Sequence, residues 1–216
     1  MTVAIVVVAL LLLLGLLVEE KKQRGNRILW FKTPLSCLFV LTALVQPHPL
    51  PAYYLWVLIG LVLGLVGDVC LALPGDRAFK AGLVAFLAGH LLYIVAFAGL
   101  TRTDDWLSLV SLVIVAASVG VFLWLRPRLG PMVGPVGVYV VVITVMLIAA
   151  WAAYCHPAIQ PLGGAAIFVG ALLFYLSDLF VARDRFVRRQ FLNRLLGLPL
   201  YYAGQFLIAC SVGLVG

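Results

Sequence analysis

The sequence predicts an all-α protein built of transmembrane helices, and three properties of the chain lead to this class. Of the 216 residues, 65% are hydrophobic and only 11% are charged, and the mean hydropathy is +1.18. A soluble domain has about 25% charged residues, so this chain has too little polar surface for one. Eight apolar runs follow one another, each of roughly the length that a bilayer crossing requires. We therefore expect a polytopic membrane protein with one integral domain over residues 1–216.

Short connections rich in Pro, Gly and charged residues separate the eight runs. The first run has no Lys or Arg before it and no small-residue cleavage site after it, so we interpret it as a retained helix and not a signal peptide. The second run is interrupted near its start by Lys32 and Pro34, and later runs are bounded by Pro74 and Pro157. The expected spans are residues 3–18, 28–45, 52–73, 79–100, 106–125, 136–154, 162–181 and 195–215.

The distribution of positive charge predicts the orientation of these spans. Fourteen of the fifteen Lys and Arg residues lie in or beside the odd-numbered connections, and the even-numbered connections hold only Arg102. Cytoplasmic loops carry the excess of Lys and Arg, so we expect these connections in the cytoplasm and both termini outside, in the plasma membrane. The same rule explains the net charge of +7, and we expect no nucleic-acid partner.

Two acidic residues lie inside the expected spans, Asp68 and Asp178. A charge at membrane depth costs several kcal/mol and usually marks a substrate path, an ion path or a reaction. At 1.5 Å per residue, both carboxyls lie roughly 8–9 Å below the odd-numbered connections. Tyr202, His90 and Gln205 follow at roughly 12–15 Å. We expect the two acids to converge in one polar chamber near the cytoplasmic face. The alternative for the supporting residues is helix–helix hydrogen bonding or simple packing.

Equal offsets in the two halves of the chain suggest an internal duplication. Gly60 precedes Asp68 by eight residues, and Gly170 precedes Asp178 by eight. Four spans per half would repeat the same orientation, as in parallel repeats about the membrane normal. Two parallel four-helix repeats are therefore an arrangement that the sequence leaves open.

Two blocks place polar residues at fixed positions inside apolar helices. The first is Leu65-Val-Gly-Asp-Val-Cys-Leu-Ala-Leu-Pro-Gly75 with Ala85-Phe-Leu-Ala-Gly-His90, and the second is Gly170-Ala-Leu-Leu-Phe-Tyr-Leu-Ser-Asp178 with Leu200-Tyr-Tyr-Ala-Gly-Gln205. In this order and separation they resemble the YhhN-like membrane proteins, a family that includes the lysoplasmalogenases. With the Lys32–Leu35 entry to the second span, the resemblance covers most of the chain after the first helix. One departure is Lys32-Thr-Pro34, since many relatives place Lys directly before Pro.

The resemblance implies a lysoplasmalogenase, which hydrolyses the vinyl-ether bond of a lysoplasmalogen to a fatty aldehyde and glycerophosphoethanolamine or glycerophosphocholine. It assigns catalysis to Asp68 and Asp178. Vinyl-ether hydrolysis needs a protonated acid and a carboxylate, and two close carboxyls in apolar surroundings can supply both. The other residues matched by the family or placed near the lipid phosphate are expected to support catalysis or bind substrate: His90, Tyr93, Tyr202, Gln205, Lys32, Arg183 and Arg185.

Two other classes of function compete with this enzyme. A small proton-coupled transporter of lipids or solutes would use Asp68 and Asp178 as a proton relay, and a lipid-binding or assembly protein would use them only for packing. Acids near one face, and not at the midplane, favour the enzyme. We expect no cofactor, and no metal because His and Cys form no ligand-like cluster. The expected partners are the lysophospholipid substrate and membrane lipids, and the oligomeric state stays open.

Overall fold

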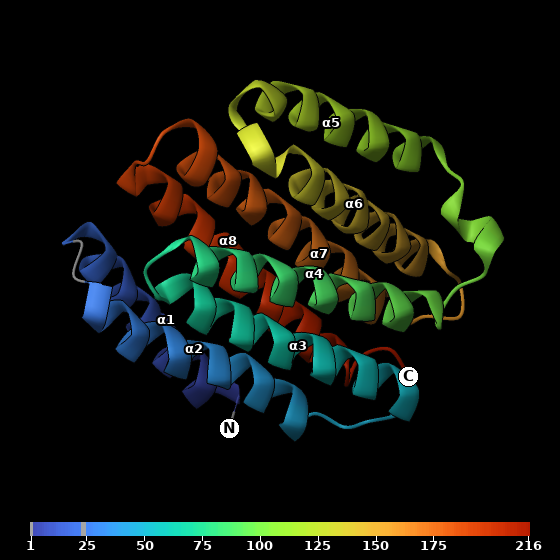
Figure 1. Cartoon of the computed structure of the whole chain (residues 1–216). Helices are drawn as coiled ribbons and strands as arrows, with labels where there is room; N and C mark the ends of the chain where they lie inside the picture. Colours follow the sequence, from blue (N-terminus) through green and yellow to red (C-terminus); the bar gives the residue numbers. More distant parts are fainter. Residues whose placement is uncertain (1, 23–24) are drawn as a thin grey trace.

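The structure, a computed structural model that describes residues 2–22 and 25–216, contains eight long α-helices (Figure 1). Three 3-10 turns and one π turn connect some of them, and the described residues include no strand. The all-α prediction is therefore confirmed. The long helices are α1 (Thr2–Lys21), α2 (Gly25–Val45), α3 (Pro51–Ala72), α4 (Asp76–Ala98), α5 (Leu109–Leu125), α6 (Val133–Cys155), α7 (Pro161–Ala182) and α8 (Phe191–Ser211).

Six of these helices, α2 to α7, are long and apolar enough to cross a membrane. The chain is therefore an integral membrane protein. Membrane crossing by α1 and α8, and with it the full count of eight spans, stays a prediction. The two parallel four-helix repeats also stay a prediction.

The observed boundaries differ from the expected ones by three residues at one end of α1, α2, α4, α5 and α6 and by four at both ends of α8. Thr103–Trp106 forms a 3-10 turn, and α5 begins only after Ser108, whose side chain accepts a hydrogen bond from the backbone of Ser111. The last helix begins four residues earlier than expected and continues through Pro199. The second helix likewise continues through Pro34. Membrane helices tolerate such prolines because neighbouring helices satisfy the backbone groups that the proline leaves without a hydrogen bond.

The helix α8 lies inside the bundle, and α5 lies at its edge (Figure 1). Residues of α8 contact α1, α2, α3 and α7, whereas α5 packs mainly on α6. The outward side chains of α5 are apolar and exposed, among them Leu109, Leu112 and Val113. A helix surrounded by protein can carry polar side chains that lipid would exclude. This explains why the polar residues of α8 coexist with so apolar a chain.

The end of α1, the start of α2 and the connections α3–α4, α5–α6 and α7–α8 gather at one end of the bundle (Figure 1). These segments form or flank the odd-numbered connections, in or beside which the sequence has fourteen of its fifteen Lys and Arg residues. We call this the basic end.

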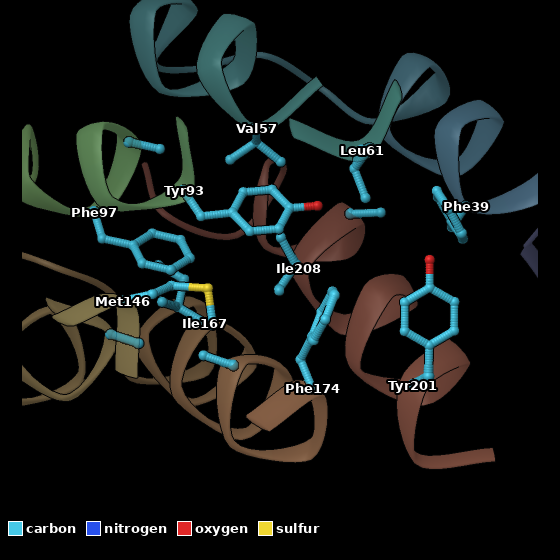
Figure 2. Close-up of a cluster of buried hydrophobic side chains, with 14 of the residues drawn as sticks. Phe39, Val57, Leu61, Tyr93, Phe97, Met146, Ile167, Phe174, Tyr201 and Ile208 are labelled. Atoms are coloured by element: carbon cyan, nitrogen blue, oxygen red, sulfur yellow. The ribbon is translucent and has the colours of Figure 1, made fainter. Parts of the chain in front are cut away.

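Aromatic and aliphatic side chains fill the core between α2, α3, α4, α6, α7 and α8, as Figure 2 shows around Tyr93, Phe97, Phe174 and Ile208. The backbones of α7 and α8 approach closely where two glycines meet. A Cβ atom on Gly204 would lie 2.7 Å from the carbonyl oxygen of Gly170. Small residues at such crossings allow the close packing on which membrane helices depend.

Candidate active site

A cavity of about 650 Å³ lies in the half of the bundle nearest the basic end. Asp68, on α3, and Asp178, on α7, both line it. The two acids singled out from the sequence therefore face one common space. Much of the remaining wall is apolar and comes from α3, α4 and α6: Leu71, Phe79, Leu83, Phe86, Val140 and Ile143.

Asp68 is buried among hydrogen-bond donors and one cation. The ammonium of Lys32 lies 3.1 Å from Oδ1. The hydroxyls of Ser36 and Tyr201 each donate to Oδ2 at 2.6 Å. The residue is only 1% exposed, so these three partners replace the water that a carboxylate otherwise requires.

A second row of polar side chains extends this cluster into the core. Tyr93 donates to Oε1 of Gln205 at 2.8 Å, and Nε2 of Gln205 donates to the hydroxyl of Tyr201 at 3.2 Å. The Tyr202 hydroxyl lies 3.3 Å from that of Ser36. The predicted residues Tyr93, Tyr202 and Gln205 thus gather behind Asp68 and do not line the cavity.

Asp178 has a much sparser environment. Its Oδ2 accepts a hydrogen bond of 2.7 Å from Tyr139 on α6. No other hydrogen bond or ion pair reaches this carboxyl within the described part of the chain, and none joins it to Asp68. Direct sharing of one proton would require a hydrogen bond between the two acids, and the described residues show none.

His90 lies away from the cavity wall, in an aromatic environment. It is 1% exposed, and neither ring nitrogen has a hydrogen-bond partner within the described residues. Its ring is 4.6 Å from that of Phe174 and 5.3 Å from that of Tyr139, measured between centroids. His90 is thus buried among aromatic rings without a polar partner in the described residues, and its supporting role stays a prediction.

The two arginines expected to bind phosphate have different surroundings. Arg183 donates to Asn193 at 3.0 Å and does not line the cavity. Arg185 lines it but is paired with Asp76, and its guanidinium carbon is 4.3 Å from the ring centroid of Phe79. Both residues therefore have protein partners, and Arg185 stands at the basic end of the cavity.

The cavity lining also includes two exposed arginines that the sequence reasoning did not select, Arg188 and Arg189. Neither has an ion-pair partner within the described residues. By contrast Arg194, also at the lining, is paired with Glu20 and Asp184. The arginines without partners are those available to a ligand.

Sequence reasoning also missed Ser36, Tyr139 and Tyr201. Ser36 lies one helical turn after Lys32, a spacing that places both on one face of α2. Tyr201 is the neighbour of the selected Tyr202, and it is Tyr201 that faces Asp68. No sequence pattern shows which of these two tyrosines faces the acid. Tyr139 is one of two tyrosines in a largely apolar helix, and only the packing of α6 against α7 identifies it.

No group of three His, Cys, Asp or Glu side chains close enough to hold a metal ion occurs within residues 2–22 and 25–216. The donors that line the cavity are carboxyl, hydroxyl, ammonium and guanidinium groups.

These features define a class, an all-helical membrane protein with two intramembrane aspartates in one cavity near its basic end. The YhhN family model matches residues 26–212, and the chain belongs to the YhhN family. The resemblance noted in the sequence is confirmed.

Several curated relatives are named lysoplasmalogenases. The human lysoplasmalogenase TMEM86B is 34% identical over 197 residues, covering 86% of this chain and 77% of the relative. A lysoplasmalogenase of Mycobacterium bovis is 31% identical over 196 residues, covering 87% of this chain and 71% of the relative. The uncharacterized membrane protein YhhN of Escherichia coli is 30% identical over 184 residues, covering 85% and 86%. No solved structure matches the chain.

Proposed function

We propose that this protein is a membrane hydrolase that cleaves the vinyl-ether bond of lysoplasmalogens by acid/base catalysis with two carboxyls, Asp68 and Asp178. The products are a fatty aldehyde and glycerophosphoethanolamine or glycerophosphocholine. The observation that supports the proposal is that Asp68 and Asp178 both line one cavity with largely apolar walls, in a chain whose curated relatives include lysoplasmalogenases.

The reaction needs groups of this kind. Protonation of the outer alkene carbon creates an oxocarbenium ion, water adds to it, and the hemiacetal collapses to an aldehyde and an alcohol. Glycosidases meet a related oxocarbenium ion with two carboxyl groups. General acid catalysis by a positioned carboxyl contributes about 10²–10⁴-fold.

The position of the cavity suits a lysolipid. The vinyl-ether bond lies directly below the glycerol, at the boundary between headgroup and alkyl chain. A lipid that enters from the basic end brings this bond to the carboxyls, with its phosphate near Arg188 and Arg189 and its chain along the apolar wall. In our proposal all eight helices cross the plasma membrane, both termini lie outside, and the basic end is cytoplasmic.

The one-sided cavity favours an enzyme over a transporter. Its lining residues all come from the half of each helix nearest the basic end; on α6, for example, they run from Val136 to Ile143 within Val133–Cys155. The substrate and ion sites of secondary transporters lie instead near the bilayer midplane, where they open alternately to either face.

The test uses purified protein in lipid–detergent micelles and three lysolipids that share one headgroup. The vinyl-ether lipid is expected to release aldehyde, whereas the saturated alkyl-ether and acyl lipids release none. In D₂O the aldehyde should carry one deuterium at the carbon next to the carbonyl, because that carbon receives the catalytic proton.

Asp68→Asn and Asp178→Asn should each lose about 10²–10⁴-fold in turnover. Asp104→Asn is the matched control, because Asp104 is exposed in the α4–α5 connection. Absence of aldehyde from the vinyl-ether lipid, or near-normal turnover by either intramembrane variant, refutes the proposal.

A further inference from the structure

The two carboxyls of the cavity differ sharply in what surrounds them. Asp68 has a cation at 3.1 Å on one oxygen and two hydroxyl donors at 2.6 Å on the other. An opposite charge and hydrogen bonds to the charged form both favour an ionised carboxylate. Asp68 is therefore one half of a buried ion pair, with two hydroxyl donors on its second oxygen.

In the row of hydrogen bonds that leads from Tyr93 to Asp68, each residue donates to the next one toward the carboxylate. The Tyr93 hydroxyl donates to Gln205, the Gln205 amide donates to Tyr201, and Tyr201 donates to Asp68. Because Tyr201 accepts from the amide behind it, its own hydrogen is directed at the carboxylate. Chains of this kind polarise their members and strengthen one another. The row therefore supports a permanent negative charge at its end.

Asp178 lacks this support. Its only hydrogen-bond donor within the described residues is Tyr139, at Oδ2. Three of the cations that line the cavity have carboxylate partners of their own: Lys32 pairs with Asp68, Arg185 with Asp76, and Arg194 with Glu20 and Asp184. Arg183, five residues after Asp178, donates to Asn193. The unpaired Arg188 and Arg189 lie on the exposed loop beyond the end of α7, ten and eleven residues further along the chain. A carboxyl in apolar surroundings without a cation favours its neutral form.

We propose that the two aspartates divide the work: Asp178 is the proton donor, Tyr139 is its positioning residue, and Asp68 stays a carboxylate throughout turnover. The Tyr139 hydrogen occupies Oδ2 of Asp178, so the acidic proton resides on Oδ1 and points away from Tyr139. The chemistry of this assignment rests on the proposed function, but the resting protonation states do not.

The proton balance closes with Asp178 alone. The alkene electron pair takes the Oδ1 proton, forming a C–H bond and leaving an oxocarbenium ion beside the fixed charge of Asp68. Water attacks the carbon bonded to the ether oxygen and gives a proton back to the Asp178 carboxylate. The hemiacetal hydroxyl then loses its proton, the C–O bond breaks, and the glycerol oxygen gains a proton. One water is consumed, and both carboxyls return to their starting states.

The resting states can be read by infrared spectroscopy of the purified protein at neutral pH, without substrate. A protonated carboxyl has a C=O stretching band whose frequency shifts in D₂O. A carboxylate lacks this band. We expect this band to disappear in Asp178→Asn and to persist in the double variant Lys32→Met/Asp68→Asn. The double variant is used because it removes the buried ion pair as a unit and leaves no unpaired charge to disturb folding.

Tyr139→Phe provides the second reading. Loss of its hydrogen bond should shift the band to higher frequency and lower kcat more than it changes KM. Tyr53→Phe is the matched control, because Tyr53 is also a buried tyrosine, but its hydroxyl is paired with Ser211 and it does not line the cavity.

A band that vanishes in the double variant and persists in Asp178→Asn overturns the assignment, and so does the absence of any such band in the unmodified protein. Failure of the proposed function is a separate result, because it shows as absence of aldehyde from the vinyl-ether lipid whatever the infrared spectrum contains.

Discussion

The ion pair between Lys32 and Asp68 should make the stability of the bundle sensitive to the loss of either partner alone. The side chains are 9% and 2% exposed, with 3.1 Å between Nζ and Oδ1. Removal of one partner from a buried pair costs about 3–5 kcal/mol, because the other charge remains without compensation. Lys32→Met should therefore lower the free energy of unfolding by about 3–5 kcal/mol, and Asp68→Asn by a similar amount.

The double variant Lys32→Met/Asp68→Asn should recover most of that loss, since replacement of a whole buried pair by uncharged groups is often close to neutral. The assay is reversible unfolding in mixed micelles, followed by tryptophan fluorescence, for the four members of the cycle. Effects of the two single changes that simply add in the double variant would refute the reasoning, because independent contributions imply that the charges do not compensate each other.

Three further predictions concern substrate binding, packing and orientation. Arg188→Gln should raise KM about tenfold by removing a charged hydrogen bond to phosphate, whereas Arg102→Gln, at the opposite end of the bundle, should leave KM unchanged; equal effects would contradict the phosphate site. Gly204→Ala should destabilise the protein by about 1–3 kcal/mol through overpacking, and Gly120→Ala, where a Cβ meets nothing within 4 Å, should not, as unfolding in micelles will measure. Cys155, exposed at the end of α6, should react with an impermeant maleimide added outside intact cells, and the Cys155→Ser variant should not. Labelling of Cys155 only after lysis would show that the orientation is the opposite of the predicted one.

The sequence was informative about the membrane class because a transmembrane helix is a continuous run of apolar residues, which can be recognised in the sequence alone. Runs of apolar residues and the Lys and Arg at their ends predicted the helical architecture and most helix bounds. The largest shift concerns the last helix, whose first turn contains Asn193 and Arg194. A hydropathy pattern assigns such a turn to a loop, whereas the structure places it in a helix that protein surrounds.

Within the candidate site, the sequence located the charges but not their partners. Asp68 and Asp178 stand out because acids are rare inside apolar spans. Lys32 was considered for the lipid headgroup, and the structure pairs it with Asp68. Neither Tyr201 nor Tyr139 differs locally from the other tyrosines, since the choice depends on how each helix is rotated about its axis. That rotation is determined by packing between helices far apart in the sequence.

The central position of α8 has a consequence for the making of the protein. Tyr201 and Gln205, which complete the hydrogen bonds around Asp68, belong to α8, which is synthesised after the seven helices that precede it. Until α8 is in place, Asp68 lacks part of its set of hydrogen-bond partners, and the space between α2 and α7 that α8 fills is unoccupied. A chain that ends before α8 should therefore be recognised by membrane quality control, and the chemistry can begin only when α8 has packed against the earlier helices.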